Sequence, residues 1–339
     1  MDIKEKNVVY VCNNSYIWMT GISMLSLLSH NSGIHVYVVC PDIQQNNRLL
    51  LEETARSYGG CCTILHVPDS FAMKKTLRQR WPFFTITRLF AAKILPDTIH
   101  RILYLDSDTF VIGNLEKLWD MNMKGFCYCG VKDCVGRRYK RNIGLSDNDP
   151  YINGGVFLAD LNALRKLEIK SGIEEFFRKY IYSMSYFDQD VLNSVFRGNI
   201  GILPPEYNVM TTVIKMDYKS LCILRHPSNY YSREEINSAR RHPYIIHFSS
   251  HLLSIRPWFR ESEHPYAELF QHIADISPWT KQVPRKAAPF LQRFAALIFQ
   301  TCPASIRKVL LYIFGFIHSV LYPDFRYLKN EAYQFINGG

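Results

Sequence analysis

The segment RILYLDSDTFVIG (101–113) places two carboxylates directly after an apolar run. RILYL has the composition of a buried strand, and Asp106 and Asp108 follow it on alternate positions. Side chains on alternate positions of an extended chain lie on the same side, so these two carboxylates can share one hard cation. A divalent ion held there can bridge the phosphates of a nucleotide diphosphate and offset charge on a leaving group. Asp-x-Asp also occurs in solvated turns and helix caps, so its position after a strand is what gives it weight.

The chain before this segment alternates apolar strand-like runs with helical patterns. We expect strands at 7–12, 35–40, 62–67 and 101–105, and helices at 16–28, 44–58 and 84–95. This order is typical of βαβ units with a mostly parallel sheet. Ligands of such sheets bind at the carboxyl ends of the strands, where the acidic pair lies.

The pattern is less regular after residue 110. We expect a helix at 171–183, a second helix that opens with FDQD (187–190), and a strand within PYIIHF (243–248). The fold class predicted is therefore α/β, with a nucleotide-binding first half and an acceptor-shaping second half built around one sheet.

Charge and cysteine content narrow the class of protein. The formal net charge of +10 over 339 residues favours an anionic partner. The N-terminal sequence MDIKEKNVVYVCNN lacks the pattern of a secretory signal, and the nine cysteines are scattered, so we interpret the thiols as reduced and structural. Cys127, Cys129 and Cys134 lack the C-x-x-C pair of a zinc site, and a half-buried strand accounts for them equally well.

The C-terminal segment changes character. Between residues 284 and 322 it has basic residues and no acidic ones, and apolar side chains recur there at helical spacing. The run VLLYIFGFIHSVLY (309–322) is too short for a bilayer span. We favour a basic amphipathic helical tail at an anionic membrane surface over two helices that close the core. No aromatic–basic pattern of an RNA-binding sheet is present, so a nucleic-acid partner is not expected.

Other polar residues become candidates for metal or ligand contacts once they are considered together with the acidic pair. His247 follows an apolar strand and is the natural third metal ligand, although a lone histidine there is more often structural. Arg256 can hold phosphate oxygens as a forked donor. Asn153 precedes two glycines that can let the backbone approach a ligand closely, although by themselves they indicate a plain turn into a strand. Asp188 and Asp190 fit ordinary capping of a helix. An aspartyl phosphatase is an alternative, but Phe110 occupies the position where its motif has Thr or Val.

Taken in order, several motifs resemble retaining glycosyltransferase family 8. They are ILYLDSDTFVIGNLEKLW, YINGGVFLADL, FDQDVLN, PPEYNVM and IIHFSS followed by RPW. The resemblance covers roughly residues 7–265. This family includes lipopolysaccharide α-galactosyl- and α-glucosyltransferases, capsule enzymes and glycogenin-like proteins. It implies a GT-A fold, a UDP-sugar donor, and Mn²⁺ or Mg²⁺ as cofactor.

The resemblance also assigns roles to residues. It implies metal ligands at Asp106, Asp108 and His247, and catalytic or sugar-contacting groups at Gln189, Asp188 and Asp133. Donor contacts are implied at Val11, Asn13, Ser15, Arg88, Asp106, Ser107, Asn153, Ser250 and Arg256. The chain departs from the family pattern at three of these: Asn13 stands where many members have Asp, Ser250 replaces Gly, and Arg256 replaces Lys in a longer loop.

The expected function follows from this resemblance. It is transfer of galactose or glucose from a UDP-sugar to a glycan or lipid-linked glycan of lipopolysaccharide, capsule or another cell-surface polysaccharide. A sugar-nucleotide-binding protein with a degenerate site is the non-enzymatic alternative. We expect a GT-A domain over 1–283, divided near residue 125, and a tail over 284–339. The expected location is the cytoplasm, at the inner face of the plasma membrane.

Overall fold

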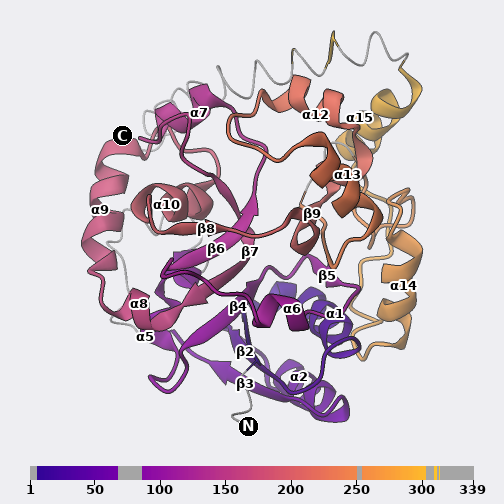
Figure 1. Cartoon of the computed structure of the whole chain (residues 1–339). Coiled ribbons are helices and arrows are strands. Elements are labelled where there is room, and N and C mark those ends of the chain that lie inside the picture. The colour runs from indigo at the N-terminus through magenta and orange to yellow at the C-terminus, as the bar shows by residue number, and fades with distance from the viewer. Residues whose placement is uncertain (1–5, 68–85, 250–253, 303–308, 311–312, 314–339) are drawn as a thin grey trace, which may run out of the picture.

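A seven-stranded mixed sheet forms the centre of the protein (Figure 1). The computed structural model describes residues 6–67, 86–249, 254–302, 309–310 and 313. The strands follow the order β3 (Cys61–Leu65), β2 (Ile34–Val39), β1 (Lys6–Val11), β4 (Arg101–Leu105), β7 (Ile152–Asp160), β6 (Tyr128–Lys132) and β8 (Ile200–Ile202). The α/β fold expected from the alternating pattern is confirmed.

Both faces of this sheet are buried. Along β1, Val8 and Tyr10 belong to one apolar cluster, and Val9 and Val11 belong to the other. The first cluster includes residues of α1 (Ile17–Leu28) and α2 (Gln45–Ser57), and the second includes residues of α5 (Ala91–Ile94), α8 (Leu161–Arg165), α9 (Ile169–Tyr180) and α10 (Phe187–Val195). Because side chains alternate across a strand, near-continuous apolar runs such as NVVYVC fit a sheet covered on two sides.

The first four strands in the order β3–β2–β1–β4 run parallel, as predicted. The expected helix at 84–95 is partly outside the described residues, which resume at Ile86 and contain the 3-10 turn η3 (Arg88–Phe90) before α5. The helix expected at 171–183 ends earlier, at Tyr180.

The fifth strand reverses direction. β7 lies antiparallel to both β4 and β6, and β6 pairs in parallel with β8. Asn153, Gly154 and Gly155 lie inside β7, so the interpretation of these glycines as a plain turn is wrong. Their backbone is extended because it pairs with neighbouring strands, and it thereby reaches the carboxyl end of β4.

A small second sheet brings distant residues to the same place. It has the order β5 (Thr109–Val111), β10 (Ile245–His247) and β9 (Val209–Met210). The antiparallel register of β10 on β5 pairs His247 with Thr109, next to Asp108. Other helices around these sheets are α6 (Glu116–Trp119), α7 (Arg137–Asn142), α11 (Thr211–Lys215), α12 (Tyr218–Arg225), α13 (Arg233–Arg241) and α14 (Ala267–Ile276).

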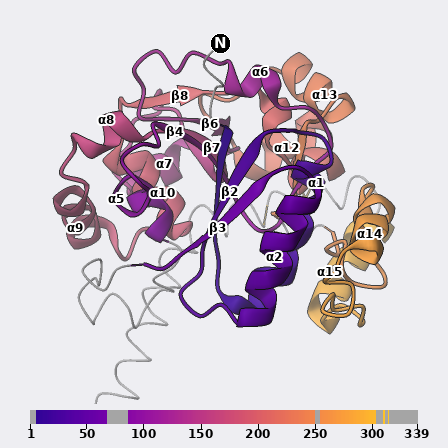
Figure 2. The same cartoon turned by 90° about the horizontal axis from the view of Figure 1, so that it is seen from below.

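The helix α15 (Phe290–Thr301) confirms the first expected tail helix. Figure 2 shows it beside α14, on the flank of the molecule that carries α1. Ala296 is buried against Ile255, whereas Phe290 and Phe294 are 69% and 51% exposed. Among the described residues no helix is both long and apolar enough to cross a membrane. Most of the run 309–322 lies outside the described residues.

Candidate active site

The acidic turn after β4 is fixed by backbone and hydroxyl hydrogen bonds. The amide of Asp106 donates to the carbonyl of Gly155 at 2.8 Å, and the amide and hydroxyl of Thr109 donate to the carbonyl of Asp106. The Ser107 hydroxyl lies 2.8 Å from that of Thr20 in α1. The turn is therefore anchored to β7, to β5 and to α1, which holds the two carboxylates in place.

Asp106, Asp108 and His247 form one cluster, in which each offers a ligand atom within 4.8 Å of the others. The Nε2 atom of His247 lies 3.2 Å from Asp108 Oδ1 and 4.0 Å from Asp106 Oδ2. Its other ring nitrogen, Nδ1, is 3.1 Å from the side-chain oxygen of Asn208. An imidazole held through one nitrogen and facing carboxylates with the other has the arrangement of a metal ligand. The donor set fits a divalent cation.

Burial and neighbouring charges act in opposite directions on the pKa values of Asp108 and His247 in this cluster. Burial raises the pKa of Asp108, but His247 and Arg256 outweigh it and lower that pKa to about 2. Burial lowers the pKa of His247, and Asp108 more than compensates, so the pKa of the imidazole is raised. Arg256 Nη1 lies 3.2 Å from Asp108 Oδ2. Asp108 is therefore ionised at neutral pH and available to a cation.

Arg88 occupies the opposite side of the acidic turn. Its guanidinium contacts Asp106 Oδ1 and Asp188 Oδ2, each at 2.9 Å, and lies 4.7 Å from the centre of the Tyr104 ring. Burial lowers the pKa of Arg88, but these two carboxylates reverse the effect and raise it. Burial raises the pKa of Asp188 to about 6 against the opposing effect of Arg88. Arg88 thus links the strand end to α10.

A continuous amide network joins α10 to the metal cluster. Oε1 of Gln189 accepts from the Gly154 amide at 2.9 Å and from Asn153 Nδ2 at 3.1 Å, while its Nε2 donates to Asp133 Oδ2 at 3.0 Å. Asn153 Oδ1 accepts from Asn208 Nδ2 at 2.9 Å, and Asn208 holds His247. Both ends of the Gln189 amide are therefore fixed.

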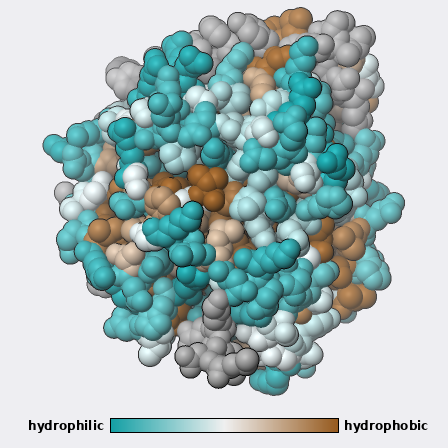
Figure 3. Space-filling model, in the orientation of Figure 1, coloured by the Kyte–Doolittle hydropathy of each residue, from teal (hydrophilic) through white to brown (hydrophobic). Residues whose placement is uncertain are grey.

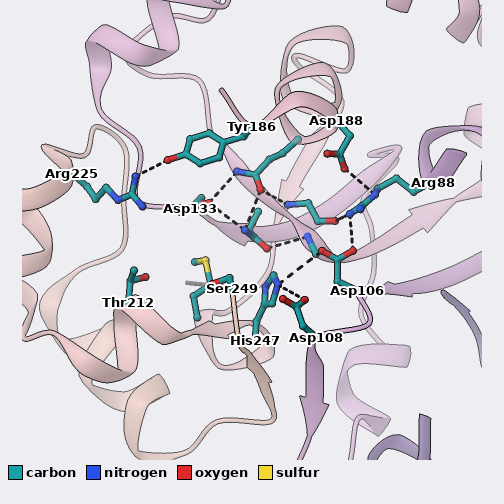
Figure 4. A pocket seen from close by; sticks show the side chains of 15 residues that line it. Arg88, Asp106, Asp108, Asp133, Tyr186, Asp188, Thr212, Arg225, His247 and Ser249 are labelled. Atoms are coloured by element: carbon teal, nitrogen blue, oxygen red, sulfur yellow. Dashed lines mark hydrogen bonds and ion pairs between the residues drawn. The ribbon is translucent and has the colours of Figure 1, made fainter. Parts of the chain in front are cut away.

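These groups line one cavity of about 460 Å³. Its wall also includes four residues to which the sequence assigned no role: Tyr186, Met210, Thr212 and Arg225. Figure 4 shows Arg225 and Tyr186 on the side away from Arg88 and Asp106. The surface of the molecule seen in Figure 3 is mostly hydrophilic, with apolar residues near its centre and over the flank of α14. Asp106 and Asp108 line one end of the cavity and Arg225 lines the other. The cavity can therefore hold a polar ligand that spans an acidic end and a basic end.

The pattern that describes "Glycosyl transferase family 8" matches residues 7–262. The chain belongs to this family. It is 24% identical over 263 residues to the general stress protein A of Bacillus subtilis, covering 76% of this chain and 88% of that protein. It is 27% identical over 304 residues to the lipopolysaccharide 1,2-glucosyltransferase of Escherichia coli, covering 87% and 86% of the two chains.

The solved structures support the GT-A fold of this family 8 glycosyltransferase. The galactosyltransferase LgtC, crystallised with donor and acceptor sugar analogs, superposes with a TM-score of 0.66. The sequence identity is 22%, and the match covers 81% of this chain and 99% of LgtC. The predicted family and fold are both confirmed.

Not every residue assigned from the family pattern lies in the cavity. Residues that the structure brings together there are Arg88, Asp106, Asp108, Asp133, Asn153, Asp188, Gln189 and His247. Ser15 and Arg256 line a neighbouring cavity of about 520 Å³, together with Trp258. Val11 is buried at the end of β1, and the Asn13 side chain accepts from the Ser15 amide. Ser250 lies outside the described residues.

The acidic residues of α10 do more than cap a helix. Asp188 pairs with Arg88, and neither acidic side chain belongs to the N-cap residue, which is Tyr186. Asp190 is fully buried and accepts from the hydroxyls of Tyr139 and Tyr151 at 2.6 and 2.5 Å. It also accepts from two backbone amides that precede the helix. Asp190 therefore fixes the position of α10, whose first turn also carries Asp188 and Gln189 of the site.

Proposed function

We propose that this family 8 glycosyltransferase is a retaining enzyme that transfers glucose or galactose from a UDP-sugar to a glycan acceptor of lipopolysaccharide, capsule or another cell-surface polysaccharide. The observation that carries the proposal is the Asp106–Asp108–His247 cluster in the same cavity as Arg88 and Gln189. The names of two relatives support the choice of hexose, since one is a glucosyltransferase and the other a galactosyltransferase.

Mn²⁺ or Mg²⁺ would be held by Asp106, Asp108 and His247. When bound, such an ion supplies positive charge against the diphosphate of the leaving UDP. In this chain Asp108 is ionised at neutral pH and Asn208 orients His247, so both side chains are suited to bind the ion. Arg256, 3.2 Å from Asp108, is a forked donor suited to phosphate oxygens at the same end.

Retention of configuration limits how the sugar can react. A covalent route needs a nucleophile, as in retaining hydrolases, which use a carboxylate. Gln189 is an amide, and hydrogen bonds engage both its oxygen and its nitrogen. We therefore favour attack by the acceptor on the face that UDP leaves, with a UDP phosphate oxygen as base. Gln189 would support positive charge on the sugar, Asn153 and Asp188 would contact the donor sugar, and Asp133 would line the reaction centre, where it holds the Gln189 amide.

Release of UDP from UDP-glucose and UDP-galactose, with Mn²⁺ and without an acceptor, tests the function directly. Asp108→Asn should abolish release while the unfolding temperature without metal stays close to that of the wild type. Asp97→Asn is the matched control, because the Asp97 side chain is 97% exposed and is not among the residues that line the cavity. Undiminished release in EDTA would refute the metal site. Binding of UDP-sugar without any release would instead support the degenerate binding protein.

We also propose that the chain acts at the cytoplasmic face of the membrane, with a GT-A domain over 1–283 and a basic tail over 284–339. The exposed side chains of Phe290, Phe294 and Leu297 on α15 support this, as do the basic residues of the tail. Full-length protein should bind phosphatidylglycerol vesicles, and Phe290→Ser with Phe294→Ser should weaken the binding. Leu49→Ser on α2, 52% exposed, is the control. Equal binding by all three proteins would refute a role for α15.

A further inference from the structure

Arg225 differs from the other cations at the candidate site. It is the last residue of α12 and reaches the cavity wall, where Nη1 donates to the Tyr186 hydroxyl at 2.6 Å. Arg88 contacts two carboxylates and Arg256 contacts one. In the part of the chain that the structure describes, no carboxylate lies within ion-pair distance of Arg225. A guanidinium has five N–H donors, so most of its donors remain available to a ligand.

The nearest acidic candidate, Asp133, is already satisfied. Its Oδ1 accepts from the Cys134 amide at 2.7 Å, and its Oδ2 accepts from Gln189 Nε2 at 3.0 Å and Asn153 Nδ2 at 3.2 Å. These bonds commit Asp133 to the amide network. Tyr186 and, at longer range, Asp133 raise the pKa of Arg225, but among the described residues no carboxylate forms an ion pair with it. Arg225 therefore lines the cavity without an ion-paired counter-charge.

The segment that carries Arg225 is tied to further positive charge. Gly136 forms a backbone bridge with Pro227, and a side chain at Gly136 would meet the Arg225 carbonyl at 2.8 Å. The next two residues after Gly136 are Arg137 and Arg138, which are exposed at the start of α7. The Arg225 end of the cavity thus adjoins a basic stretch, while the metal end is acidic.

We propose that Arg225 selects acceptors that carry an anionic group, a phosphate or a carboxylate, on or beside the sugar that is extended. The inference rests on the proposed function, since the cavity must take an acceptor as well as the donor. The donor phosphates belong to the end with Asp106, Asp108 and His247, so the acceptor occupies the side of Tyr186 and Arg225. The guanidinium fork matches the geometry of a phosphate or carboxylate and binds it by paired, charge-assisted hydrogen bonds.

Binding of three simple probes tests this selectivity. Glucose, glucose 6-phosphate and glucuronate are titrated calorimetrically into full-length protein saturated with UDP and Mn²⁺. We expect at least one anionic probe to bind about tenfold more tightly than glucose, the effect of one good charged hydrogen-bonded contact. Preference for glucose 6-phosphate alone identifies a phosphorylated acceptor, preference for glucuronate alone a uronate, and preference for both a general anion site.

Variants of Arg225 distinguish direct binding of an anionic acceptor group from mere positioning of Tyr186. Arg225→Gln should bring the probes to within about twofold of glucose, and Arg225→Lys should keep part of the preference. Arg178→Gln, which removes the same charge from the exposed surface of α9, should behave like the wild type. If Arg225 only positions Tyr186, Arg225→Gln will weaken all three probes equally, and the proposal is wrong. It is also wrong if the wild type prefers neither anionic probe, or if the preference persists in Arg225→Gln.

The same samples distinguish this inference from the proposed function. Binding of UDP and release of UDP from a UDP-sugar are measured on the wild type without any acceptor probe. Absence of both would overturn the transferase proposal itself. Normal UDP binding and release, with no preference for an anionic probe, would overturn the role of Arg225 alone.

Discussion

Gly155→Ala should disable the metal site while leaving the sheet intact. A methyl group at this position would lie 2.3 Å from Cε1 of His247 and 2.8 Å from Oδ2 of Asp106. Carbon atoms in contact normally lie about 3.5–4.0 Å apart, so the ring must move by about 1 Å or more. Gly155 does not have a positive φ, so alanine adds no backbone strain. Overpacking of this kind costs about 1–3 kcal/mol of folding free energy.

The larger effect should fall on metal affinity. At a Mn²⁺ concentration about 100 times Kd, bound metal stabilises a folded protein by about 2.7 kcal/mol. Tenfold weaker binding reduces this to about 1.4 kcal/mol, and displacement of the ligands should also lower UDP release by about 100-fold.

Thermal unfolding with and without Mn²⁺, together with UDP release, measures both effects. Gly154→Ala is the matched control, because its added methyl group would come no closer than 3.3 Å to Gln189 Cβ. We expect it to retain most of the Mn²⁺-dependent stabilisation. If Gly155→Ala gained as much stability from Mn²⁺ as the wild type, the assignment of His247 and Asp106 as ligands would fail.

Three further outcomes follow from buried polar groups. Asp190→Ala leaves two tyrosine hydroxyls and the Tyr186 amide without this acceptor, and the Ser185 amide keeps only the Tyr139 hydroxyl, so urea unfolding should show a loss of about 3 kcal/mol or more; a loss below about 1 kcal/mol would contradict its structural role. Asn208→Ala removes the partner of His247 Nδ1 and should weaken Mn²⁺ binding by about 10–100-fold in calorimetry, whereas unchanged affinity would show that the ring needs no such support. Lys140 is fully buried, and burial lowers its pKa from 10.5 to about 8. The folded protein therefore releases this proton near pH 8, whereas the unfolded chain keeps it to about pH 10.5. The free energy of unfolding of the wild type should therefore rise relative to that of Lys140→Met by about 1 kcal/mol per pH unit above pH 8. A constant difference between the two free energies from pH 7 to pH 10 would refute this.

Local sequence patterns were sufficient for β1 to β4, for β10 and for the acidic pair, but not for β5 to β9. Asp106 and Asp108 follow five apolar residues directly, so their place at a strand end depends only on neighbours in sequence. His247 joins them through the pairing of β10 with β5, which lie far apart in the chain. No local pattern indicates that pairing; the position of His247 after an apolar strand made it a candidate ligand, and the family resemblance then supported it.

Two features could not be predicted, for the same physical reason. Glycines beside Asn153 carry a local signal for a turn, yet Gly155 lies in a strand, where His247 and Asp106 approach so closely that only glycine fits. Arg225 owes its position to a left-handed residue at His226, which ends α12, and to the bridge between Pro227 and Gly136, the residue before α7. Both depend on which segments meet in the folded chain, and one sequence does not contain that information in local form.

The reversed strand β7 has a consequence for any attempt to divide the protein. It covers one edge of β4, while β1 covers the other, and residues 102–105 of β4 are fully buried. A fragment that ended near residue 125 would expose an unpaired apolar edge, which is prone to aggregate. The complementary fragment would carry Gln189 and His247 but neither carboxylate of the acidic turn. We therefore expect the two fragments to be insoluble or inactive when produced separately, and to regain UDP release only when they are expressed together.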